Sequence, residues 1–527
     1  MVLTWIIVIP AVGGILAWIL ARWSASAARW ISFLAMAATF ILTVLLWVLH
    51  PDPSFGNVIV DHRILWVPQF GISYHLAMDG LSLLLVLLTT VLGVISVAAS
   101  WREITDRVGA FHFSMLLLLS GILGVFLARD LFLFYFFWEL MLVPMYFLIG
   151  LWGHENRIYA AIKFFLFTFI SGLFMLIAII GLVVVHQQAT GVYTFDYSAL
   201  LETEMSRRTA FLLMMGFFTA FAVKLPAFLV HTWLPDAHTE APTAGSVILA
   251  GLMLKTGAYG MLRFAIPLFP YASNTLAPAA MIIGVAGIIY GAVLAFAQRD
   301  FKRMVAYTSV SHMGFVLLGI YAGTRIALQG AIVEILAHGL ATGALFLIVG
   351  MVQERTHTRD FQRLGGLWET MPKLGGFTLF FALAALGLPG MGNFVGEFLI
   401  LLGTFQVSVP LAVIGTLGFV FSVVYALRLV QLSVHGPNEH NWRLPNLSAR
   451  EVAILGILAV LILWLGLYPQ PVLNTASPFL THYGLRITDF RITHHASLIT
   501  SHSSLITHHP SLLPPRPIPP LERSSSQ

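Results

Sequence analysis

Residues 221–242 read FAVKLPAFLVHTWLPDAHTEAP, an apolar run in which Lys224 and Pro226 stand two residues apart. Proline lacks a backbone N–H and disrupts the helical turn before it, and a charged side chain is costly inside an oily segment. Two histidines and several acids follow within a few residues. This stretch therefore predicts a helix that is interrupted beside a buried ammonium group.

The composition of the whole chain indicates that lipid surrounds this stretch. The chain has 527 residues, of which 58% are hydrophobic and 10% charged, and its mean hydropathy is +0.88. Soluble domains carry about 25% charged residues. In a bilayer all backbone polar groups must be paired internally, and the apolar runs here are too long for barrel strands. We therefore predict an all-α polytopic membrane protein.

The apolar runs predict about 14 transmembrane helices of roughly 20 residues each. Residues 2–20 are expected to be a first spanning helix rather than a removed signal peptide, because no typical cleavage site precedes Arg22. In chain order the expected spans are 2–20, 30–49, 80–99, 112–128, 131–150, 161–185, 210–230, 243–266, 278–297, 303–322, 326–351, 374–405, 411–433 and 452–468.

Spans 7 and 12 are expected to be broken helices, at Pro226 and at Pro389 within GLPGMGNFVGEFL. Breaks at matching places indicate an inverted repeat, with the working site at the breaks. The predicted repeats are spans 4–8 and spans 9–13. The predicted divisions are 1–110 (helices 1–3), 111–270 and 271–435 (the two inverted five-helix repeats), 436–482 (the last loop and helix 14) and 483–527 (a tail).

The tail is rich in Ser, Pro and His and is predicted to be disordered. It is either an extension without a role or a histidine-type metal tract, and we favour the first. The chain has no cysteine, which excludes disulfides, Fe–S ligation and cysteine zinc sites. Most Lys and Arg in the loops follow odd-numbered spans, so both termini are expected to be non-cytoplasmic.

Four ionisable residues lie in the middle of expected spans: Glu139, Lys224, Lys255 and Glu397. A charge at mid-helix costs about 2.5–3.5 kcal/mol on insertion scales, so these groups must pair, face water or lose their charge. Lysine can release a proton, whereas arginine stays protonated. We therefore expect proton transfer along a polar path, with Glu139 and Lys224 acting as a switchable ion pair.

Histidines extend this path. His312 and His338 lie in mid-span, and Glu334 precedes His338 by one helical turn. His231 and His238 follow the first break and are expected to form a secondary path to the cytoplasm.

Structural alternatives stay open for all of these residues. The mid-span histidines could be structural hydrogen-bonding groups, the Glu and Lys residues packing ion pairs, and His231 and His238 loop caps. Lys163 is nearer a span end and is expected to extend to the membrane surface.

Several long motifs resemble those of the antiporter-like proton-translocating subunits of respiratory complex I, in particular the M chains of bacterial NADH–quinone oxidoreductase. The motifs are WELMLVPMYFLIG, FAVKLPAFLVHTWLPDAHTEAPTAGSVILAGLMLKTGAYG, AYTSVSHMGF and GLPGMGNFVGEFLIL. The resemblance covers about residues 1–480. It implies that Glu139 partners Lys224, that Lys255 is the central relay, that His312 and His338 continue the axis, and that Glu397 is the terminal group. Two features depart from the pattern: the tail, and Glu334, where a neutral polar residue is expected.

The resemblance implies a non-redox subunit of a translocase that moves protons while other subunits pass electrons from NADH to quinone. No cofactor or metal is expected in this chain, since flavin, Fe–S clusters and quinone belong to other subunits. The expected partners are other membrane subunits, especially two sister antiporter-like chains, and the lipid of a bacterial inner membrane, with no nucleic acid. The alternatives are a subunit of a multi-chain cation/proton antiporter or membrane-bound hydrogenase, a stand-alone solute carrier, and a membrane scaffold.

Overall fold

The structure is a computed structural model that describes residues 1–50 and 58–481; the predicted tail lies outside the described residues. The elements in chain order are α1 (Val2–Leu20), α2 (Ala25–Leu49), β1 (Val60–Val67), η1 (Pro68–Phe70), β2 (Ile72–Met78), α3 (Gly80–Glu103), α4 (Val108–Leu127), α5 (Leu131–Leu140), α6 (Leu142–Trp152), α7 (Arg157–Thr190), α8 (Tyr197–Leu200), α9 (Arg207–Lys224), α10 (Trp233–Glu240), α11 (Thr243–Ile248), η2 (Leu249–Met253), α12 (Leu254–Gly260), η3 (Met261–Ala265), α13 (Ile266–Leu268), α14 (Pro270–Phe296), α15 (Phe301–Ala322), α16 (Arg325–Thr356), α17 (Leu367–Thr370), α18 (Pro372–Ala385), α19 (Gly392–Phe405), α20 (Val409–Ser433) and α21 (Ala449–Leu467).

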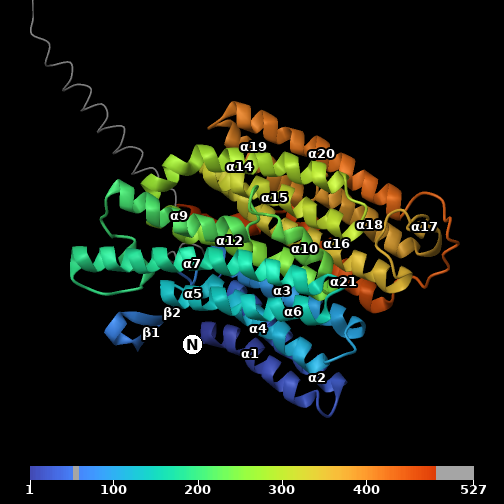
Figure 1. Ribbon diagram of the computed structural model, residues 1–527, viewed down its shortest axis with the longest axis horizontal. Coiled ribbons are helices and arrows are strands. Elements are labelled where there is room, and N and C mark those ends of the chain that lie inside the picture. Colours follow the sequence, from blue (N-terminus) through green and yellow to red (C-terminus); the bar gives the residue numbers. More distant parts are fainter. Residues whose placement is uncertain (51–57, 482–527) are drawn as a thin grey trace, which may run out of the picture.

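The long helices run side by side, with β1 and β2 at one end of the molecule and α17 at the other (Figure 1). Among the described residues, 12 helices are long and apolar enough to cross a membrane, where α5 with α6 and α11 through α13 count as one span each. The protein is therefore a multi-pass membrane protein. These 12 coincide with expected spans, and the two expected spans not among them are the two that were predicted to be broken.

Both predicted breaks interrupt the helices where the sequence placed them. Helix α9 ends at Lys224, just before Pro226, and α10 begins only at Trp233. Helix α18 ends at Ala385 and α19 begins at Gly392, with Pro389 between them. Gly387 and Gly390 in this second break have φ of 77° and 96°, a conformation that glycine adopts without steric cost.

Two further interruptions were not expected. Expected span 5 is divided at Met141 into α5 and α6. Expected span 8 contains two π-helical stretches, η2 and η3, on either side of α12. π-helical turns inside α-helices are frequent at functional sites. The interruptions flank Glu139 and Lys255, so all four mid-span ionisable residues lie beside irregular backbone.

The prediction of an all-α chain was incomplete, because β1 and β2 form an antiparallel hairpin between α2 and α3. The pairing runs from Val60 opposite Met78 to Val67 opposite Ile72, with an irregularity near the turn. Six of the seven β2 residues are buried, so this strand packs on the helices.

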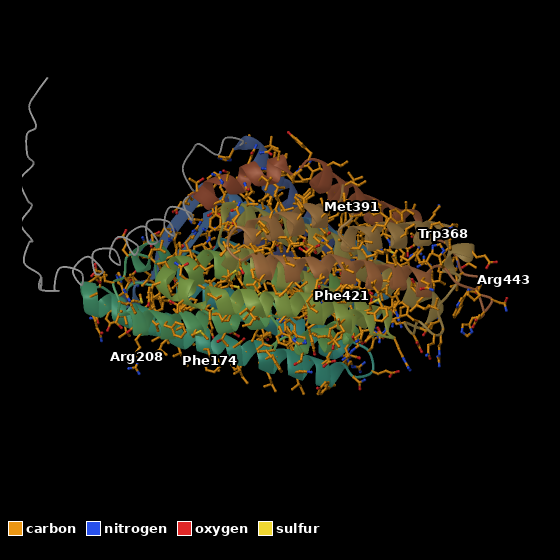
Figure 2. The ribbon with its side chains drawn as sticks, turned by 90° about the horizontal axis from the view of Figure 1, so that it is seen from above. Phe174, Arg208, Trp368, Met391, Phe421 and Arg443 are labelled. Atoms are coloured by element: carbon orange, nitrogen blue, oxygen red, sulfur yellow. The ribbon has the colours of Figure 1, made fainter. Side chains whose placement is uncertain are left out.

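The outer helices separate the core from lipid. Helix α7 exposes a stripe of apolar residues at nearly helical spacing, including Ile158, Ile162, Leu166, Ile170 and Phe174. Figure 2 shows Phe174 on the outer surface and places Arg208 and Arg443 at opposite ends of the molecule. In contrast, 94% of the apolar window of α16 and 100% of that of the α11–α13 span are buried inside the protein. The central helices therefore carry the site.

Candidate functional site

Lys255 lies at the centre of the protein and is completely buried. Its Nζ donates to the backbone carbonyl of Ala250, in the π-helical turn η2, at 2.6 Å. The same Nζ lies 2.6 Å from Nδ1 of His338 on α16. An uncharged imidazole nitrogen can accept this hydrogen bond from the ammonium group. The arrangement satisfies a buried cation with one carbonyl and one titratable partner.

A second histidine and an acid continue from His338. The rings of His338 and His312 have centroids 5.4 Å apart, and both side chains are buried. Nδ1 of His312, on α15, lies 2.7 Å from Oε1 of Glu397 on α19. The structure thus brings four of the predicted residues, from four helices, into the order Lys255, His338, His312 and Glu397. We call these four residues the buried row.

The Glu397 end of the buried row contains groups that the sequence analysis did not assign. Oε1 of Glu334 lies 3.5 Å from His312 Nδ1 and accepts a hydrogen bond from Asn393 Nδ2 at 3.1 Å. The hydroxyl of Tyr425 lies 3.3 Å from His312 Nε2. Donor atoms of His312, Glu334 and Glu397 all lie within 4.8 Å of one another, a spacing that would also allow a metal ion to bind.

Glu139 and Lys224 form a separate pair of electrostatic neighbours. Among the described residues, no ion pair joins them within 4 Å, and Glu139 Oε1 and Lys224 Nζ are buried without hydrogen-bond partners. Lys224 Nζ lies 5.0 Å from the ring centroid of Trp138 and 5.8 Å from that of Phe164, distances typical of cation–π contacts. Since Lys224 ends α9, the negative end of the helix dipole also favours its charge.

The Glu139–Lys224 pair and the buried row are not joined by a direct hydrogen bond. Lys224 Nζ has no hydrogen-bond partner within the described part of the chain, so none links it to Lys255. The helices that carry the two lysines nevertheless pack closely, because Gly257 and Gly260 let α12 approach α9; a β-carbon at Gly260 would lie 2.3 Å from a ring carbon of Phe221.

The two loop histidines take different places. His238 is completely buried and stacks on Phe346 with ring centroids 4.5 Å apart. The charges of Lys302 and Lys255 both act on it, so it lies beside the buried row. His231 lies within the break itself and contacts the rings of Phe228 and Tyr290.

Two lysines have partners that the sequence analysis did not assign. Lys163, which is expected to extend to the membrane surface, also pairs with an acid: its Nζ lies 2.7 Å from Asp236 Oδ2, because α10 brings that acid beside α7. Lys302 appeared to be a loop charge, yet its side chain is buried and its Nζ donates to the carbonyl of Ala241. The partner of Lys302 is 61 residues away in the chain, so no local pattern indicated it.

Comparison with known proteins identifies the family. Residues 128–423 match the family model described as "NADH:quinone oxidoreductase/Mrp antiporter, TM". The protein named NADH-quinone oxidoreductase subunit M from Pseudomonas aeruginosa is 55% identical over 489 residues, which cover 90% of this chain and 96% of the relative. This chain belongs to the NADH:quinone oxidoreductase/Mrp antiporter family.

Two further members show that the likeness extends over the whole described fold. The protein of the same name from Escherichia coli K12 is 53% identical, with the same coverage. A chain in the structure "Respiratory complex I from Thermus thermophilus with bound NADH" superposes with a TM-score of 0.84 at 32% identity, covering 92% of this chain and 100% of that one. The segment matched by the family model contains the buried row, Glu139 and Lys224. The resemblance seen in the motifs is thereby confirmed.

Proposed function

We propose that this chain is the M-type, proton-translocating membrane subunit of a bacterial NADH–quinone oxidoreductase. The observation that carries the proposal is the buried row, in which a lysine, two histidines and a glutamate follow one another across four helices. Electron transfer from NADH to quinone takes place in other subunits, which hold the flavin, the Fe–S clusters and the quinone. This chain contributes the proton path and no redox chemistry.

In the buried row each titratable group can pass a proton to the next. Protonated Lys255 donates to His338 Nδ1, and transfer along this hydrogen bond leaves a neutral amine and an imidazolium. The neighbouring His312 can accept the proton and pass its own Nδ1 proton to Glu397. Each charge moved against the membrane potential costs about 2.3 kcal/mol per 100 mV. That free energy comes from coupling to the neighbouring subunits.

Glu139 and Lys224 control proton release in the first repeat, spans 4–8. With Glu139 ionised nearby, Lys224 retains its proton; when the carboxylate is neutralised or moves away, Lys224 releases it. The unpaired Nζ supports this role, because a buried ammonium without a hydrogen-bond partner is a group whose charge depends on its neighbours. His238, on which the charges of Lys302 and Lys255 both act, belongs to a secondary path with His231.

The two broken segments also cross the membrane in this proposal, which gives 14 spans in two inverted repeats. Matching backbone bridges support the repeats. Asp130, before α5, bridges to Asp196, and Asp300, before α15, bridges to Asp360, with the same pair of flanking backbone hydrogen bonds. Helices α5 and α15 begin spans 5 and 10. Because five is an odd number of spans, a shift of five spans places the two bridges on opposite sides of the membrane. Figure 1 shows the hairpin and α17 at opposite ends of the molecule.

The chain resides in the bacterial inner membrane with both termini non-cytoplasmic, since the loop Lys and Arg residues favour that orientation. Its partners are the other membrane subunits of the complex, above all the two sister antiporter-like chains. This proposal is preferred to a solute carrier because the buried row places titratable groups next to one another in the core of the helix bundle.

Proton pumping in membrane vesicles tests the proposed function. The variants Glu139→Gln, Lys224→Ala, Lys255→Ala and Glu397→Gln are each scored for NADH-driven pumping and for assembly of the complex. We expect assembled complexes that have lost pumping. Glu202→Gln and Lys373→Ala, which change exposed residues, are the matched controls and should pump as wild type does. Wild-type pumping in all four assembled site variants would refute the proposal.

A further inference from the structure

Glu334 is a completely buried acid, and the proton transfer proposed above assigns it no role. Its Oε1 lies 3.5 Å from His312 Nδ1, and Oε1 of Glu397 lies 2.7 Å from the same nitrogen. Two ionised carboxylates beside one imidazole in a buried site repel each other strongly. Such a pair holds one proton between its members. The neighbours of the two acids indicate which of them carries it.

Asn393 singles out Glu334 as the protonated acid. Asn393 Nδ2 donates to Glu334 Oε1, whereas Glu334 Oε2 and Asn393 Oδ1 are buried and have no hydrogen-bond partner within the described part of the chain. An ionised carboxylate oxygen and an amide oxygen both accept, so they cannot bond to each other. A proton on Oε2 makes this oxygen a donor toward the amide oxygen. One proton then closes a cyclic acid–amide pair and satisfies both buried atoms.

We propose that Glu334 is a second proton-holding carboxyl of the buried row, which carries its proton on Oε2 and donates it to Asn393 Oδ1 while Glu397 stays ionised. The inference rests on the proposed function, because it sets the charge beside the same path. It also accounts for a carboxyl where the family resemblance implies a neutral polar residue: the protonated acid is itself neutral and pairs with Asn393 as an amide would.

The proton balance of this site follows from the hydrogen bonds. In the resting state His312 is neutral, and its Nδ1–H donates to ionised Glu397. A proton that arrives at Nε2, beside the hydroxyl of Tyr425, drives the Nδ1 proton onto Glu397 Oε1. Both carboxyls are then protonated, and His312 is neutral with its proton on Nε2. Release of the Glu397 proton, followed by a half-turn of the His312 ring that brings an N–H back toward Glu397, restores the resting state. The charge of Lys255 also acts on Glu334.

The variant Glu334→Gln tests the inference, because glutamine is neutral at every pH and can keep the amide pair with Asn393. In wild-type vesicles, alkaline pH removes the Glu334 proton and places two negative charges around His312, so pumping falls. We expect Glu334→Gln to retain most of the wild-type pumping near neutral pH and to shift the alkaline limb of the pH profile upward. An unchanged profile, or a loss of pumping at all pH values as in Glu397→Gln, would overturn the inference.

An infrared measurement on the assembled complex keeps the test independent of that variant. Wild-type protein at neutral pH should show the carbonyl stretch of a protonated carboxyl, and this band should move in Asn393→Leu, which removes the hydrogen-bond acceptor. A band unaffected by Asn393→Leu would contradict the assignment to Glu334. Wild-type pumping by Glu397→Gln would instead count against the proposed function, so the two failures are distinguishable.

Discussion

Lys255 Nζ and His338 Nδ1 lie 2.6 Å apart on two different helices, and neither side chain is exposed to solvent. The ammonium group has a carbonyl and an imidazole as its partners, so the imidazole is its titratable neighbour along the buried row. In the proposed function this contact is the step at which a proton enters the histidine pair.

The variant Lys255→Arg tests that step while keeping a positive charge. Arginine remains protonated under all accessible conditions, so it should stabilise the site without releasing a proton. We expect the complex to assemble and NADH-driven pumping to be lost. Assembly is measured by blue native electrophoresis and pumping by a pH-sensitive dye in vesicles. Retention of wild-type pumping would show that Lys255 acts only through its charge.

The carboxyl of Glu139 is held against α7 at Gly172. A β-carbon at Gly172 would lie 2.4 Å from Glu139 Oε1, so Gly172→Ala must displace the carboxyl group. We expect reduced pumping in an assembled complex, since displacement changes the electrostatic interaction with Lys224. The control is Gly150→Ala, where the nearest atom to the new β-carbon is 3.6 Å away. Equal pumping by the two variants would show that the position of Glu139 is unimportant.

Asp79 links two buried arginines at the start of α3, with contacts of 2.9 Å to Arg129 and 2.6 Å to Arg263. Asp79→Asn keeps the shape and leaves both cations without their counter-ion. Breaking a buried ion pair costs about 3–5 kcal/mol. We expect a clearly lower thermal unfolding temperature in detergent, and Asp106→Asn, at an exposed acid, should leave it unchanged.

The stabilisation that Asp79 contributes through its two arginines should depend on pH in a predictable direction. Burial alone would raise the pKa of Asp79, but the charges of Arg263 and Arg129 outweigh burial and lower it to about 2. A lowered folded-state pKa stabilises the protein above the ordinary value of 3.8 and loses this contribution as the pH falls through about 2. The difference in stability between wild type and Asp79→Asn should therefore persist throughout the neutral range.

His75 on β2 joins the hairpin to the helices through two acids. Its Nδ1 lies 2.7 Å from Asp196 and its Nε2 3.0 Å from Asp61, while Arg63 also approaches Asp196 at 3.5 Å. Burial lowers the pKa of His75, but hydrogen bonds and charges from Asp196 and Asp61 outweigh burial and raise it. The ion pairs are thus fully formed below the ordinary pKa of 6.5 and are lost as the pH rises through the raised value.

Hydrogen exchange of the hairpin amides measures this effect. Exchange of the β1 amides should accelerate as the pH rises through the folded-state pKa of His75, beyond the intrinsic pH dependence of exchange. His75→Asn should abolish that excess, whereas His62→Asn, on the neighbouring strand, should keep it. A constant protection in wild type across this range would contradict the prediction.

Much of the fold could be predicted because the membrane requires long apolar helices. The positions of Pro226 and Pro389 also placed both breaks, since proline acts on its own helix. The hairpin, the division at Met141 and the π-helical turns beside Lys255 were missed. The division had a local signal that the prediction did not use, since Pro144 disrupts the turn that ends at Leu140. The π-helical turns depend on packing between segments.

The sequence selected the residues that the structure brings together in the buried row, but not their geometry. Lys255, Glu397 and the two histidines were selected because ionisable residues in mid-span are rare in lipid. Tyr425 is 113 residues from His312 in the chain, so no local pattern connected them. Lys302 was hidden by its nearness to a helix end, where basic residues usually face water.

The close approach of α9 and α12 at Gly257 and Gly260 fixes the spacing of two buried lysines. A β-carbon at Gly257 would lie 2.6 Å from the carbonyl oxygen of Phe221, and one at Gly260 would lie 2.3 Å from the ring of that residue. Lys224 ends α9 and Lys255 lies on α12, so a larger side chain at either glycine would push apart the helices that carry the two lysines.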